Sequence, residues 1–113
     1  MTHFRESLTL SREIEEPRTI AYCLGGGAVI FAARGEYTHA TTLLGAASTI
    51  RTQTGAVSSP GRREMTDTVE AQCREALSAE AFARAWEDGA SLDAIAAAEW
   101  ALRYWEEPSS RSP

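Results

Sequence analysis

The chain has 113 residues and a net charge of −5, and all eleven of its basic residues are arginine. This length fits one domain and is too short for two independent hydrophobic cores. The charge is uneven, because residues 1–56 sum to zero whereas residues 57–113 sum to −5. An acidic half argues against a nucleic-acid surface, which needs clustered positive charge, and against binding to an anionic membrane.

Helix-forming composition and local breaks predict an all-α protein. Alanine is the commonest residue and also the best helix former, and no segment alternates as a strand does. The predicted helices cover residues 3–15, 18–33, 36–53, 61–77, 79–88 and 92–106. We predict one domain over residues 1–107 and a flexible tail over residues 108–113.

Several residues mark the expected helix ends. Gly35 suits the left-handed backbone that ends a helix, and Gly55 and Gly89 are expected to close the third and fifth helices. Ser78 and Ser91 are expected to cap the first turns of the fifth and sixth helices, because a serine hydroxyl accepts a hydrogen bond from a free amide there.

The reactive side chains do not form a recognisable catalytic, cofactor or metal site. Cys23 and Cys73 are far apart without a CxxC motif, and a zinc site needs about four convergent ligands, so we expect both to be small buried residues. Cys73 belongs to a predicted core stripe on the fourth helix, which consists of Met65, Val69, Cys73 and Leu77. No nucleophile lies near His39, which is therefore expected on the surface. The start of the chain has no apolar stretch typical of a secretion signal, which predicts a cytoplasmic protein without a membrane span.

Three consecutive glycines, Gly25, Gly26 and Gly27, interrupt the predicted second helix. They cost about 2–3 kcal/mol relative to alanine, so they need a reason. One reading is close packing against the first helix, and the other is a ligand that approaches the backbone. Thr41 and Thr42, on the hydroxyl-rich third helix, either face solvent or line a polar groove with these glycines. A phosphate loop is not expected, because no strand precedes the glycines and no cation follows them.

The predicted sixth helix is apolar on two sides. Its core stripe is expected to consist of Ile95, Ala98, Leu102 and Trp105. A second apolar face consists of Ala97, Trp100, Ala101 and Tyr104. A helix that is apolar all round is buried on both sides or carries an interface, and Trp and Tyr are common interface anchors. We expect this face to bind a protein partner, most simply a second copy in a homodimer; the alternative is that the tail or the first helix covers it.

The predicted second and third helices alternate small and large residues in the pattern of a tetratricopeptide repeat. With Gly35 and Tyr37 at the turn of the repeat, its consensus positions fall on Leu24, Ala28, Phe31, Ala40, Leu44 and Ala47. Thr52 stands where the repeat has a proline, and a generic alanine-rich hairpin is the alternative. The expected fold is a set of antiparallel helical hairpins, with one tetratricopeptide-like repeat and a C-terminal helical cap.

The stretch from residue 12 to residue 102 resembles the C-terminal tetratricopeptide-like segment of large bacterial LuxR-type and AfsR-type transcriptional regulators. The sequence LLGAA at residues 43–47 is typical of that region, as is a later pattern formed by Ala81, Phe82, Ala85, Trp86, Gly89 and Leu92. The resemblance implies a non-catalytic protein-interaction or effector-sensing module without a cofactor. A small-molecule binder with a groove between the second and third helices is the alternative function, and a purely structural cap is a third.

Overall fold

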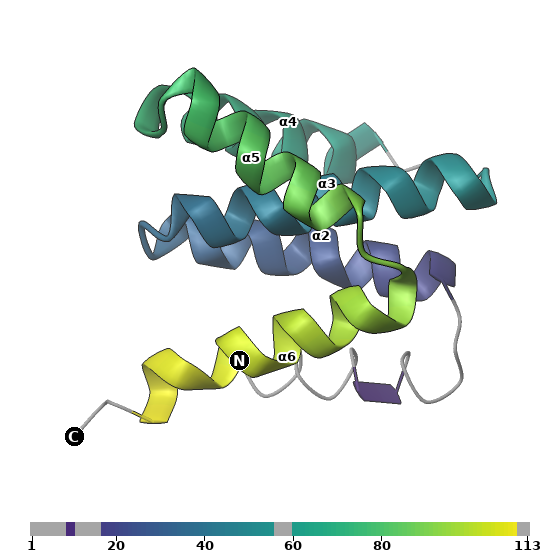
Figure 1. The fold of residues 1–113 in the computed structure, drawn as a ribbon. Helices are drawn as coiled ribbons and strands as arrows, with labels where there is room; N and C mark the ends of the chain where they lie inside the picture. Colours follow the sequence, from purple (N-terminus) through teal and green to yellow (C-terminus); the bar gives the residue numbers. More distant parts are fainter. Residues whose placement is uncertain (1–8, 11–16, 56–59, 111–113) are drawn as a thin grey trace.

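The computed structural model describes residues 9–10, 17–55 and 60–110, and within them the side chains of all but residues 60 and 104–110. The main helices are α2 (Pro17–Ala33), α3 (Tyr37–Thr54), α4 (Pro60–Ala76), α5 (Ala79–Ala90) and α6 (Ala94–Ser110) (Figure 1). This part of the chain contains no strand, which confirms the all-α prediction. The predicted helix at residues 3–15 lies outside the described residues except for Thr9 and Leu10, which are helical.

A tight turn connects α2 to α3. Gly35 adopts a φ of 82°, and its amide donates to the carbonyl of Ala32 at 3.0 Å. The next amide, that of Glu36, donates to the carbonyl of Phe31 at 2.9 Å. These two bonds satisfy carbonyls that the end of a helix leaves free, in the Schellman arrangement. The chain therefore reverses direction at Gly35, as predicted, and α3 lies along α2 (Figure 1). Gly55 ends α3 in the same left-handed conformation, with a φ of 73°.

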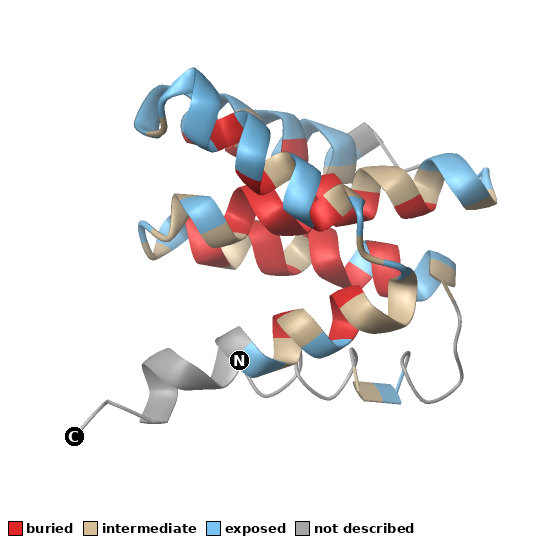
Figure 2. Cartoon of the chain, viewed as in Figure 1, coloured by how far each residue is buried: buried red, intermediate tan, exposed pale blue. Residues whose placement is uncertain are grey.

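The centre of the molecule is α3. Every residue from Ala40 to Ala47 is buried, because α3 packs against α2 on one side and α5 on another (Figure 2). The core consists mainly of Ile20, Leu24, Ala28 and Phe31 from α2 and of Leu43, Leu44, Ala47 and Ile50 from α3. The small residues among them allow close approach, while the large ones fill the space between the helices.

The contact between α3 and α5 depends on two glycines. A Cβ at Gly89 would overlap the carbonyl oxygen of Thr42, and a Cβ at Gly45 would overlap that of Trp86. Helix α5 continues to Ala90, so Gly89 lies within it, and the prediction that Gly89 closes this helix is wrong. Gly89 instead allows the backbones of α5 and α3 to touch, because only glycine leaves the necessary space.

Helix α4 runs parallel to α2, with the start of each helix at the same end (Figure 1). Arg62 lies beside Tyr22, and one turn later Thr66 lies beside Gly25. The inner face of α4 buries Cys73, which has no exposed surface and whose thiol donates to the carbonyl of Tyr37 at 3.6 Å. Cys23 is also buried, and both cysteines are free thiols, as predicted.

The ends of α5 and α6 differ in part from the predicted caps. The Ser78 hydroxyl accepts a hydrogen bond from the amide of Ala81 at 3.1 Å, which confirms this cap. Ser91 instead ends α5, and Asp93 caps α6, where its Oδ1 accepts from the amide of Ala96 at 2.7 Å. Helix α6 then continues to residue 110, so the predicted boundary between domain and tail at residue 107 falls inside a helix. None of the helices among the described residues has the length and apolar character needed to cross a membrane.

Candidate functional site

Two of the four predicted interface residues of α6, Ala97 and Ala101, face the interior of this chain. Ala97 and Ala101 have no exposed surface, and they pack with Ala98 in the core that α2 and α3 build. Of the expected core stripe, Ala98 is buried as predicted, whereas Ile95 and Leu102 are only partly buried. The alanines face inward because their small side chains let α6 approach closely. The side chains of residues 104 and 105, which include the expected interface residue Tyr104, lie outside the described residues.

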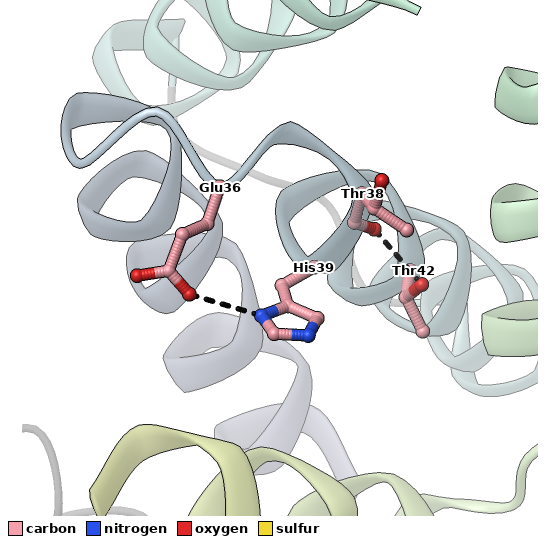
Figure 3. Close-up of polar contacts among 4 residues, drawn as sticks. All are labelled: Glu36, Thr38, His39 and Thr42. Atoms are coloured by element: carbon pink, nitrogen blue, oxygen red, sulfur yellow. Dashed lines mark hydrogen bonds and ion pairs between the residues drawn. The ribbon is translucent and has the colours of Figure 1, made fainter. Parts of the chain in front are cut away.

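Trp100 belongs to a cluster of rings that connects α6 to the turn between α2 and α3. The ring of His39 makes edge contacts with the rings of Phe31 and Trp100, each with a centroid separation of 5.4 Å. The Nδ1 atom of His39 lies 3.0 Å from Oε1 of Glu36, which orients the imidazole (Figure 3). The side chain of His39 is 31% exposed, so it lies at the surface as expected, and its ring also packs between helices.

Thr41 and Thr42 are buried in the packed centre of the molecule. The hydroxyl of Thr41 donates to the carbonyl of Tyr37 at 2.8 Å, and that of Thr42 donates to the carbonyl of Thr38 at 3.0 Å (Figure 3). These bonds satisfy both hydroxyls inside α3, where Ser and Thr commonly bond back to the preceding turn. The backbone of Thr42 meets α5, and both threonines are buried, so neither lines a groove that is open to solvent.

The glycines of α2 make room for an arginine from α4. A Cβ at Gly26 would lie 3.1 Å from Nη1 of Arg62, and one at Gly25 would lie 3.7 Å from the same atom. The guanidinium of Arg62 stacks 3.9 Å from the centre of the Tyr22 ring, and its Nη1 donates to the Tyr22 carbonyl at 3.4 Å. The glycine that follows, Gly27, is buried. Both glycines therefore lie against Arg62, a cation from a distant part of the sequence, and Gly25 also lies beside Thr66.

An open groove of about 350 Å³ lies between α2 and α4. This α2–α4 groove is lined by Val29, Ala33, Met65, Thr68, Val69 and Gln72. Met65 of α4 is 50% exposed, and Tyr22 of α2 is 61% exposed. The walls of the groove are mainly apolar and include two polar side chains, those of Thr68 and Gln72. Surfaces that bind another molecule commonly have this composition.

Sequence reasoning missed this groove because it placed Met65 in the core. Residues spaced by four drift about 40° around a helix at each step, so a stripe from Met65 to Leu77 cannot stay on one face. The structure buries Val69 and Cys73 in the middle of the stripe, exposes Met65 and half-buries Leu77.

The other chemistry of the described residues is sparse. A shallow depression of about 210 Å³ lies on α4 alone, where Arg74 pairs with Glu70 at 3.0 Å. No three His, Cys, Asp or Glu side chains in the described part of the chain come together as metal ligands. Comparison with protein-family models, curated proteins and solved structures gave no match to this chain.

Proposed function

We propose that this chain is a non-catalytic helical module that binds a protein segment in the α2–α4 groove. The observation that carries the proposal is the groove itself, with its apolar walls open to solvent and Met65 half-exposed at its edge. A methionine side chain is flexible and polarisable, so it adapts to the side chains of a partner.

The arrangement of α2, α3 and α4 supports a repeat-like architecture. In a tetratricopeptide-like array, the first helix of one repeat lies parallel to the first helix of the next, and the second helix lies behind them. Here α2 and α4 are parallel and both contact α3. Arrays of this kind use the extended surface of their stacked helices for binding. In this interpretation α5 and α6 form the C-terminal helical cap.

The partner is a segment of another protein or a second copy of this chain. The α6 face expected to hold a homodimer contributes Ala97 and Ala101 to the chain's own core, so we place the partner at the α2–α4 groove. Sedimentation equilibrium of the purified chain distinguishes the two partners: a second copy gives a dimer that Met65→Glu dissociates, whereas a foreign segment leaves a monomer.

Selection of binding peptides from a random display library tests the groove without knowledge of the natural partner. We expect peptides rich in apolar residues to be enriched on the immobilised chain and to lose binding to the Met65→Glu variant. The matched control is Ala71→Glu, which adds the same charge to another, exposed face of α4. The proposal fails if no peptide is enriched, or if both variants weaken binding equally.

A further inference from the structure

The α4 wall of the α2–α4 groove is bordered on its outer side by two glutamates. Thr68 lines the groove, and its hydroxyl donates to the backbone carbonyl of Glu64, one turn earlier, at 3.0 Å. Residues four apart lie on the same side of a helix, and so do residues seven apart, which are close to two full turns. Glu64 and Glu75 therefore lie on the same side of α4 as Thr68, and both are exposed. We call these two residues the acidic rim of the groove.

The carboxylates of the acidic rim are not engaged by the chain's own cations. Among the described residues, neither takes part in a hydrogen bond or an ion pair. Glu70, on another side of α4, instead pairs with Arg74 at 3.0 Å. Arg62, at the start of α4, lies over the Tyr22 ring of α2, 3.9 Å from its centre. The acidic rim is therefore accessible to a positive charge from outside the chain.

The groove itself is uncharged. Its walls consist of Val29 and Ala33 from α2 and of Met65, Thr68, Val69 and Gln72 from α4. A ligand in the groove thus meets mainly apolar side chains, and on the α4 side it also meets the acidic rim. The complementary ligand has an apolar face with positive charge along one edge, because electrostatic complementarity selects among partners that fit the same apolar surface.

The walls of the groove favour a helical ligand over an extended one. Both walls are continuous α-helices, whose backbone amides and carbonyls bond within each helix. The groove therefore offers no strand edge to which an extended segment could add. A helical segment satisfies its own backbone groups, and its side chains can pack between those of two neighbouring helices. Helices that bind in such grooves present apolar residues at i, i+3 or i+4, and i+7.

We propose that the α2–α4 groove binds an amphipathic helix of another protein, with basic residues along the edge that faces Glu64 and Glu75. This inference rests on the function proposed above and names the chemistry of the partner. The two glutamates are about 16 Å apart along α4, so the matching basic residues are expected about three turns apart. Charge also disfavours a second copy, because two grooves in contact about a two-fold axis would bring like-charged rims into one interface.

Selection from a display library of peptides tests the inference on the intact chain. We expect the enriched peptides to combine apolar residues at helical spacing with Lys or Arg, and to bind more weakly as sodium chloride rises, because salt screens exposed charges. The double variant Glu64→Lys and Glu75→Lys is expected to bind these peptides at least about tenfold more weakly, because two attractions become repulsions, and to enrich acidic peptides instead. The matched control reverses Glu80 and Glu87, two exposed residues of α5, and is expected to keep the affinity within about twofold.

The outcomes distinguish this inference from the function on which it rests. Enriched peptides that need Met65 but lack basic residues, or that bind the Glu64→Lys and Glu75→Lys variant equally well, would overturn the inference and leave the groove as a binding surface. Peptides that gain no helical circular dichroism on binding would also overturn it. A dimer that Met65→Glu dissociates would overturn it too, because the partner is then a second copy. Failure to enrich any peptide would contradict the proposed function as well.

Discussion

Gly89 of α5 lies against Thr42 of α3 so closely that a Cβ at residue 89 would overlap the Thr42 carbonyl oxygen and come within 2.8 Å of its carbonyl carbon. The contact is reciprocal, since a Cβ at Gly45 of α3 would lie 3.0 Å from the carbonyl carbon of Trp86 on α5. Each helix thus contributes one glycine to the crossing, and backbone meets backbone on both sides.

Gly89→Ala is therefore expected to destabilise the chain although alanine favours a helix. The added methyl group meets backbone atoms that cannot rotate away, so α5 has to move off α3, at a cost of about 3 kcal/mol or more. Urea unfolding measures this loss. Gly61→Ala is the control, because a Cβ at this helical glycine meets nothing within 4 Å, and it should be neutral or slightly stabilising. Equal stabilities of the two variants would show that the helices do not cross as described.

Trp100→Ala is expected to lower the free energy of unfolding by about 2 kcal/mol, because the tryptophan packs on His39 within its own chain. Urea unfolding measures the loss, and Glu99→Ala, at the exposed neighbouring position, is the control. A Trp100→Ala variant of full stability that no longer self-associates would contradict this packing and restore the interface predicted for α6.

Asp93→Ala should cost about 1 kcal/mol, because the Asp93 carboxylate caps the first turn of α6. Ser91→Ala should cost only a few tenths of that amount, since the Ser91 hydroxyl merely donates to the carbonyl of Asp88 behind it. Thermal unfolding of the two variants side by side checks the order. The reverse order would return the capping role to Ser91, as the sequence suggested.

Ionisation of the Cys73 thiol is expected to lower the free energy of unfolding at alkaline pH. Burial raises the pKa of its thiol above the ordinary value, while the side-chain interaction with Thr41 opposes this rise and the charge of Glu70 adds to it. The unfolded chain ionises this thiol first, so stability is complete below about pH 8.5, the unfolded pKa, and falls as the pH rises towards the folded pKa. Cys73→Ala should remove this part of the decline in urea unfolding between neutral and alkaline pH. An unchanged decline would assign it to other groups.

The helix ends were accessible from the sequence because their signals are local. Gly35, Gly55 and Ser78 act through backbone atoms only a few residues away, and all three have the predicted roles. The glycine crossing was not accessible, because Gly45 and Gly89 are far apart in the chain and no local pattern encodes their contact. The same holds for Arg62 over Gly26, because the two residues are far apart in the chain.

The prediction of which α6 residues are buried was partly wrong, for a different reason. In an alanine-rich helix the contrast between faces is weak. The prediction gave the core to Ala98, which is buried, and also to the larger Ile95 and Leu102, which are only partly buried. The structure instead buries Ala97 and Ala101, since the space beside α2 and α3 admits only small side chains at this distance. Large apolar side chains usually mark the core, but in α6 they lie at the partly exposed edges of the buried face.

Binding at the α2–α4 groove is tested most directly by an amide NMR titration of the chain with a peptide enriched in the display selection. We predict that the largest shift changes fall on the groove residues Val29, Ala33, Met65, Val69 and Gln72, while the amides of α5 and α6 stay unchanged. Largest changes on α6 around Trp100, or on α5, would contradict the groove as the binding surface.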